Sequence, residues 1–156
     1  MKAEINAAVD FVASQLRSSP DGERVAAFKA ALAELLARKY DGHWYPAQPE
    51  RGSAYRCVLV DNKVLDPALA AAAERARLGS LRALLPNDTD LVLWVDPACV
   101  SVKHNNTNRY HVLYQDDTAP ATKPLIRPRN NRGGGGTLYN THLSAASIAA
   151  ASSANK

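Results

Sequence analysis

The sequence predicts an α+β fold. It should be a single compact domain in which an N-terminal antiparallel helix hairpin packs with a small, mostly antiparallel four-stranded sheet and two short helices. Three observations lead to this prediction. Apolar residues first recur at helical spacing, short β-branched runs separated by turn residues follow, and the C-terminal part loses both patterns. We expect the folded domain to span residues 1–117 and a disordered, basic, low-complexity tail to span residues 118–156.

Two amphipathic helices are predicted at the start of the chain. In residues 3–17 the apolar side chains fall on one helical face. After a break at residues 18–22, a second apolar stripe runs to Tyr40. Asp21 or a neighbouring serine can cap the first N–H groups of this second helix, and Gly42 can end it. Because the link is short, the two helices should pack antiparallel.

The middle of the chain alternates between loop, strand and helix signals. Residues 43–54 contain two prolines and a glycine, but their aromatic side chains are costly to leave in water, so we expect an ordered loop. The β-branched run Tyr55–Val60 predicts a strand. Asp66-Pro67 begins an alanine-rich helix that should end near Gly79, because a cap followed by proline is a strong helix start. A short helix after Ser80 should complete this region.

Three further strands are predicted at Leu91–Val95, Val100–His104 and Arg109–Gln115, the last two joined by a polar turn at residues 105–108. Side chains alternate between the two faces of a strand, so Leu91, Leu93 and Val95 should face the core. Trp94 then points to the opposite face. The pattern leaves two alternatives open, in which Trp94 is either buried under a second layer or exposed as an anchor for a partner.

Charge is distributed unevenly along the chain. Residues 1–117 carry 14 Lys/Arg and 15 Asp/Glu, whereas residues 118–156 carry five Lys/Arg and no acidic residue. The nearly neutral body gives no reason to expect a nucleic-acid site in the folded domain. The tail can contact phosphates weakly.

Motifs for catalysis and metal binding are missing from the sequence. It contains no nucleophile elbow, phosphate loop or paired-histidine motif. Cys57 and Cys99 are too few for a disulfide framework or a structural zinc site, so we expect reduced thiols, no metal and no cofactor. No apolar run is long enough to span a bilayer, and Glu4 and Asp10 interrupt any signal-peptide pattern. We therefore expect a protein of the cytoplasm, the nucleus or both.

Two segments carry a resemblance to a known family. GHWYPAQPERGSAYRCVLV, residues 42–60, resembles the first signature box of the BTG/Tob anti-proliferative family, and DLVLWVDPACVSV, residues 90–102, resembles the second. The spacing between the boxes, the helical N-terminus and the VLYQDD sequence at residues 112–117 are similar as well. The resemblance covers roughly residues 1–117.

The resemblance implies a non-enzymatic adaptor. Family members bind the catalytic subunit of the Ccr–Not-type mRNA deadenylation complex and are associated with poly(A) shortening, mRNA turnover and restraint of proliferation. The residues that match the partner contact are Tyr55, Trp94, Asp96 and Pro97. The residues that match the structural part of the signature are His43, Trp44, Tyr45, Pro46, Arg56 and Cys57.

Two departures from the family pattern bear on partners. Residues 128–140 (PRNNRGGGGTLYN) match poorly the third box through which BTG members are expected to contact poly(A)-binding protein. Ala98 and Cys99 replace the bulky and acidic residues usual after Asp-Pro. Two alternatives to the adaptor remain, a nuclear co-regulator that binds transcription factors and an RNA-binding module that acts through the basic tail.

Overall fold

The computed structural model describes residues 1–17, 21–61, 63–87, 89–104 and 109–118. By internal contacts the chain divides into Met1–Ile126 and Arg127–Lys156, and every described residue belongs to the first unit. The predicted turn at residues 105–108 and nearly all of the predicted tail lie outside the described residues. The domain boundary at residue 117 stays a prediction.

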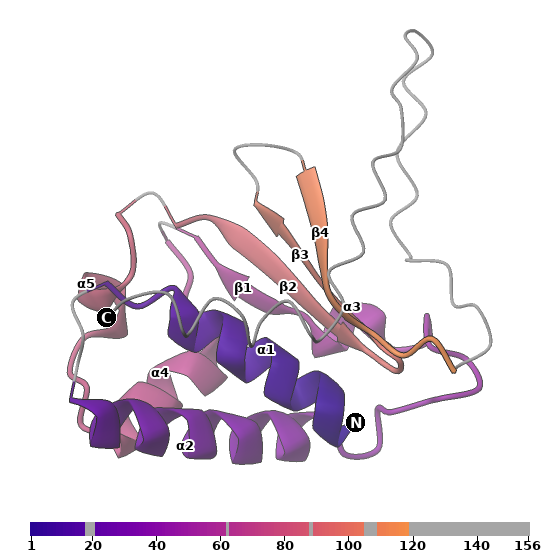
Figure 1. Ribbon diagram of the computed structural model, residues 1–156, viewed down its shortest axis with the longest axis horizontal. Coiled ribbons are helices and arrows are strands. Elements are labelled where there is room, and N and C mark those ends of the chain that lie inside the picture. The colour runs from indigo at the N-terminus through magenta and orange to yellow at the C-terminus, as the bar shows by residue number, and fades with distance from the viewer. Residues whose placement is uncertain (18–20, 62, 88, 105–108, 119–156) are drawn as a thin grey trace, which may run out of the picture. The chain divides into compact units, whose positions relative to one another are not determined.

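The two N-terminal helices are confirmed. Helix α1 spans Lys2–Ser14 and helix α2 spans Gly22–Tyr40, and they run antiparallel along one side of the domain (Figure 1). The buried side chains of α2 recur every fourth residue, from Phe28 to Tyr40, as expected for a helix that packs along one stripe. Helix α1 ends earlier than predicted because the N–H of Arg17 donates to the carbonyl of Leu84 at 2.6 Å.

The predicted strand at Tyr55–Val60 is wrong in its first half. Ser53–Arg56 forms the short helix α3, and strand β1 spans only Val58–Val60. Gly52 starts the helix in a left-handed conformation with φ +77°, and its carbonyl accepts from the N–H groups of Tyr55 and Arg56. The tertiary contacts of Arg56, described below, outweigh the β propensity of this run.

Two helices follow β1. Helix α4 spans Pro67–Arg75 and α5 spans Leu81–Leu84. The carboxylate of Asp66 caps α4 by accepting from the N–H of Ala68 at 2.9 Å. The helix ends four residues before Gly79, in a turn in which Arg77 has φ +54° and Gly79 has φ +72°.

The sheet is four-stranded and antiparallel throughout, in the order β1-β2-β3-β4. Strand β2 spans Leu91–Asp96, β3 spans Cys99–His104 and β4 spans Arg109–Gln115. Leu91, Leu93 and Val95 are buried, as the alternation predicted. Strand β4 lies at one edge of the sheet, and its register on β3 shifts between Val100 and Ser101.

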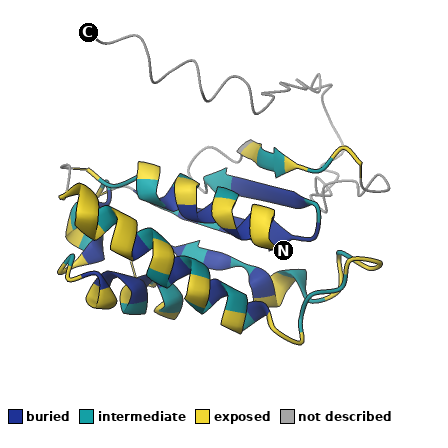
Figure 2. Cartoon of the chain, turned by 60° about the horizontal axis from the view of Figure 1, so that its bottom comes forward, coloured by how far each residue is buried: buried dark blue, intermediate teal, exposed yellow. Residues whose placement is uncertain are grey.

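Helices α1, α2 and α4 lie together on one side of the sheet (Figure 1). Figure 2 colours the chain by burial: buried residues lie where these helices and the sheet face each other, and exposed residues lie on the outer sides of the helices. Among the described residues, no helix is long and apolar enough to cross a membrane. The arrangement of these helices on an antiparallel sheet confirms the predicted α+β architecture. No described helix covers the opposite face of the sheet.

Candidate partner-binding site

Helix α3 presents Tyr55 to solvent. Nearly half of this residue, 48%, is exposed. Its ring stacks on the imidazole of His43, with the ring centroids 3.9 Å apart and an interplanar angle of 26°. Since stacking on one side restricts the motion of the ring, Tyr55 is held in place while its other side stays open.

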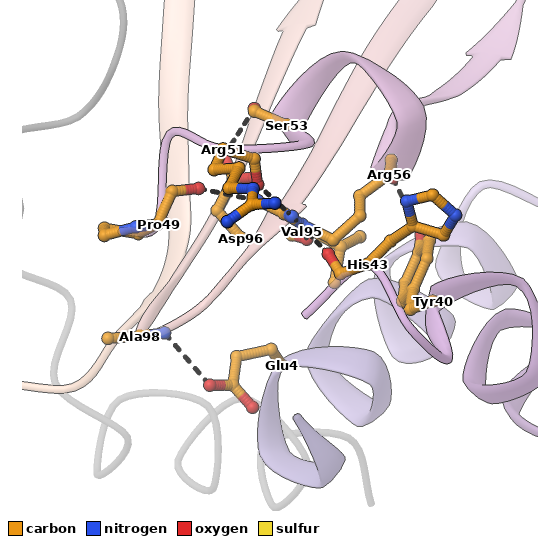
Figure 3. A network of polar contacts seen from close by, with 10 residues as sticks. All are labelled: Glu4, Tyr40, His43, Pro49, Arg51, Ser53, Arg56, Val95, Asp96 and Ala98. Carbon is orange, nitrogen blue, oxygen red and sulfur yellow. Dashed lines mark hydrogen bonds and ion pairs between the residues drawn. The ribbon is translucent and has the colours of Figure 1, made fainter. Parts of the chain in front are cut away.

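The next residue, Arg56, is fully buried and binds the preceding loop. Its Nη1 donates to the carbonyls of His43 and Arg51, both at 2.7 Å, and its Nη2 donates to the carbonyl of Pro49 at 2.6 Å (Figure 3). Guanidinium donors in a fixed fork suit several acceptors at once. One side chain therefore fixes the path of residues 43–51.

Arg56 also joins this loop to the sheet. Its Nε donates to the carbonyl of Val95 at 3.0 Å, and its Nη2 forms an ion pair with Oδ1 of Asp96 at 2.6 Å. The other carboxylate oxygen of Asp96 accepts from the hydroxyl of Ser53 at 2.9 Å. Helix α3 and the end of β2 are thus linked from both ends of the helix (Figure 3).

Asp96 and Pro97 are buried, so neither presents an open surface. Burial raises the pKa of Asp96, against the lowering effect of its hydrogen bonds from Arg56 and Ser53. The predicted role of these two residues in partner binding stays a prediction. Their positions suit residues that fix the orientation of Tyr55 and Trp94.

Of the remaining signature residues of the first box, Trp44 packs against Arg56. Trp44 stacks on Tyr40 with centroids 6.1 Å apart, and the Arg56 guanidinium carbon lies 5.5 Å from the Trp44 ring. The Tyr45 hydroxyl donates to the carbonyl of Gly42 at 2.8 Å. Pro46 is exposed.

Cys57 follows this cluster, and its carbonyl accepts from Lys39 at 2.9 Å. Burial raises the pKa of the Cys57 thiol and raises that of Cys99 to about 11, so both thiols are protonated near neutral pH. Within the described part of the chain, no three His, Cys, Asp or Glu side chains gather to hold a metal ion.

Trp94 lies on the face of the sheet opposite α1 and is partly exposed. Of the two alternatives that the sequence left open, the structure therefore favours partial exposure over full burial. The Trp94 ring reaches across β3 to Tyr110 on β4, with the centroids 5.9 Å apart. Tyr110 and Val112 are themselves 39% and 48% exposed.

Sequence reasoning missed four residues at this site. Tyr110 and Val112 alternate along a predicted strand, which was a usable sign that they share a face. Ser53 and Glu4 gave no such sign. The carboxylate of Glu4 accepts from the N–H of Ala98 at 3.0 Å, a contact between residues distant in sequence (Figure 3).

Comparisons with known proteins agree on one family. The model of the BTG family matches residues 1–114. The chain is 37% identical to human protein BTG2 over 134 residues, which cover 83% of both chains. It is 39% identical to mouse protein Tob1 over 121 residues, 76% of this chain but 33% of Tob1. The chain thus spans about a third of the length of that relative.

A solved structure shares the fold. The BTG/Tob domain of FOG-3 from C. elegans superposes with a TM-score of 0.66 at 24% identity, covering 75% of this chain and 92% of that chain. At this level of identity the likeness shows the fold alone. The family match over residues 1–114, together with relatives at up to 40% identity, shows that the chain belongs to the BTG/Tob anti-proliferative family.

Proposed function

We propose that this chain is a non-enzymatic adaptor that binds the catalytic subunit of the Ccr–Not-type mRNA deadenylase. Through this contact it would regulate poly(A) shortening, mRNA turnover and cell proliferation, in the cytoplasm and the nucleus. The observation that carries the proposal is the contrast between two neighbours, because Tyr55 is 48% exposed while Arg56 is 0% exposed. Because buried Arg56 fixes the backbone directly beside it, the exposed ring of Tyr55 is held in a defined orientation.

Rigidity favours tight binding because less conformational freedom is lost on association. Tyr55 is held by its stack on His43, and α3 is held to β2 by the Ser53–Asp96 and Arg56–Asp96 contacts. Trp94 lies two residues before Asp96 on the same strand. The two aromatic side chains therefore come from elements that are anchored to each other, and Tyr and Trp are the residue types that most often dominate binding energy.

The proposed mechanism is tethering. An adaptor that holds the enzyme through the aromatic residues, and an mRNA or a protein bound to it through another segment, raises the local concentration of enzyme at the poly(A) tail. Poly(A)-binding protein is one candidate for that second contact, although residues 128–140 match the corresponding box poorly. Asp96 and Pro97 act in this mechanism by fixing the position of Tyr55 and Trp94.

Calorimetry of the full chain with the purified deadenylase catalytic subunit tests the proposal. We expect Tyr55→Ala and Trp94→Ala each to weaken binding by at least about 2 kcal/mol, while their thermal melts show a folded protein. Val64→Thr is the matched control, since Val64 is 45% exposed and lies away from both aromatic residues in the sequence.

If the folded wild-type chain does not bind the subunit, the adaptor proposal fails. The nuclear co-regulator, which would bind transcription factors, then becomes the leading alternative. The discriminating test is whether Tyr55 and Trp94 are needed for repression of a reporter whose mRNA carries a poly(A) tail.

A further inference from the structure

The face of the sheet away from α1 carries an ordered set of side chains. Cross-strand pairing aligns Trp94 with Ser101 and Ser101 with Val112, and a second row aligns Lys103 with Tyr110. Paired residues in neighbouring strands project to the same face. Side chains from β2, β3 and β4 thus form one continuous surface beside Trp94.

Ser101 is the small residue at the centre of this surface, and its size allows the side chains on either side to approach each other. Ser101 is only 6% exposed, although no described helix covers this face. The rings of Trp94 and Tyr110 approach to 5.9 Å from opposite sides of β3, and a serine leaves the space for them to do so. The two rings therefore form one aromatic unit that spans three strands.

The outer part of this surface is open and apolar, with one cation at its edge. Tyr110 is 39% exposed and Val112 is 48% exposed. The ammonium group of Lys103 lies 5.4 Å from the centre of the Tyr110 ring, within the range of a cation–π contact. No ion pair of Lys103 with a described acidic residue is formed, so its charge remains available to a partner.

We propose that the partner-binding surface continues from Trp94 across β3 to Tyr110 and Val112 on β4, and that Lys103 at its edge receives a carboxylate of the partner. This inference rests on the proposed function and takes the deadenylase catalytic subunit as the occupant. The support for the extension is that the Tyr110 ring packs against the ring of Trp94, so the two side chains form one continuous surface. Exposed aromatic and aliphatic groups with a cation at the rim are typical of interface composition.

Three single variants in the full chain test the extension by calorimetry with the deadenylase catalytic subunit. We expect Tyr110→Ala to weaken binding roughly tenfold, Val112→Thr to weaken it roughly threefold, and Val64→Thr to leave it unchanged. Val112→Thr keeps the shape of the side chain and adds a hydroxyl. Val64→Thr makes the same chemical change at a similarly exposed valine. A difference in binding between the two variants therefore reports the position of Val112 and not the change from valine to threonine.

A purely supporting role for Tyr110 is tested separately. Tyr110→Phe keeps the ring against Trp94 and should bind like wild type. If Tyr110 only supported Trp94, Tyr110→Ala would weaken binding but Val112→Thr would not. That pattern would overturn the claim that β4 contacts the partner.

Charge at position 103 supplies a further readout. Lys103→Glu should slow association and weaken binding, more strongly at low salt than at high salt. Lys103→Arg keeps the positive charge and should bind like wild type. If Lys103→Glu binds like wild type at every salt concentration, the carboxylate contact is wrong.

The failure of this extension differs from failure of the proposed function. If Trp94→Ala abolishes binding while the variants at Tyr110, Val112 and Lys103 bind like wild type, the surface ends at Trp94 and only the extension falls. If the folded wild type does not bind the subunit, both fall. Loss of binding in the β4 variants with intact folding would establish a contact that no signature box contains.

Discussion

Arg56 and Asp96 form an ion pair at 2.6 Å in which the arginine side chain is fully buried and the aspartate side chain is 12% exposed. This pair joins the two signature segments, because Arg56 lies in the first and Asp96 in the second. The same guanidinium holds three carbonyls of the loop before α3. The orientation of Tyr55 relative to Trp94 therefore depends on one buried charge.

Removing Arg56 should severely destabilise the domain. Breaking a buried ion pair from one side leaves an uncompensated charge and costs about 3–5 kcal/mol. We expect Arg56→Ala to lower the free energy of unfolding by that amount in urea denaturation. Arg56→Lys should rescue only a small part, because an ammonium group cannot match the fork of donors that serves five acceptors.

The control for this prediction is Arg38→Ala. The Arg38 side chain is 70% exposed and pairs with Glu34 on the same helix, and such surface pairs contribute little. Its removal should change stability by less than about 0.5 kcal/mol. A loss of under about 1 kcal/mol in Arg56→Ala would contradict the role assigned to the buried pair.

Gly52→Ala should disturb the same network through the backbone. Gly52 has φ +77°, and an added Cβ would lie 3.0 Å from Nη1 of Arg56. A left-handed conformation costs a residue with a Cβ about 1–2 kcal/mol, and the contact adds to this. We expect a lower melting temperature and weaker partner binding, because α3 would shift.

Gly22→Ala provides the comparison for Gly52→Ala. Gly22 begins α2, and a Cβ there would meet nothing within 4 Å. Alanine also restricts the unfolded chain more than glycine does, so this variant should be neutral or slightly more stable. Equal effects of the two substitutions would show that the backbone at Gly52 is not special.

Alkaline pH should weaken the fold through buried groups that stay protonated. Burial raises the pKa of Cys99 from 9.0 to about 11, with the Asp96 carboxylate adding to the effect. Burial likewise raises the pKa of Tyr40, whose hydroxyl donates to the carbonyl of Arg56 at 2.8 Å. Both groups ionise first in the unfolded chain, so their stabilising contribution is complete below pH 9 and is lost as pH rises toward and beyond 11.

Denaturation at several pH values measures this loss, which for Cys99 amounts to about 2–3 kcal/mol once the pH exceeds both of its pKa values. The quantity to compare is the change in the free energy of unfolding per pH unit, not the free energy of unfolding itself. Cys99→Ala and Tyr40→Phe should each flatten that slope between pH 9 and 11. An unchanged slope in both variants would mean that these groups titrate normally in the folded chain.

The sequence was informative where one pattern determined the outcome. Apolar spacing predicted α1 and α2, and alternation predicted which residues of β2 face the core. It failed at Tyr55 and Arg56, because β propensity describes a local preference and the buried contacts of Arg56 come from residues distant in the chain. Alternation also showed that Trp94 faces away from the core, but not whether another layer covers that face.

The turn after β2 provides the last prediction. Ala98 has φ +65°, a left-handed conformation that is unfavourable for alanine. Its N–H donates to Glu4 at 3.0 Å and its carbonyl accepts from the N–H of Asp116 at 2.9 Å. These two contacts hold the turn against α1 and the end of β4, so the strain at Ala98 is balanced by hydrogen bonds.

Ala98→Gly should relieve this strain and stabilise the domain by about 0.5–1 kcal/mol, since the gain exceeds the added freedom of the unfolded chain. Glu4→Ala should do the opposite and cost about 1 kcal/mol, because the partly buried N–H of Ala98 loses its acceptor. In the double variant Glu4→Ala/Ala98→Gly, the glycine should raise the free energy of unfolding by less than it does in the wild-type background. The reason is that without Glu4 the turn can already relax to an unstrained conformation. Thermal melts of the four proteins measure this coupling, and additive effects would show that the carboxylate does not hold Ala98 in its left-handed conformation.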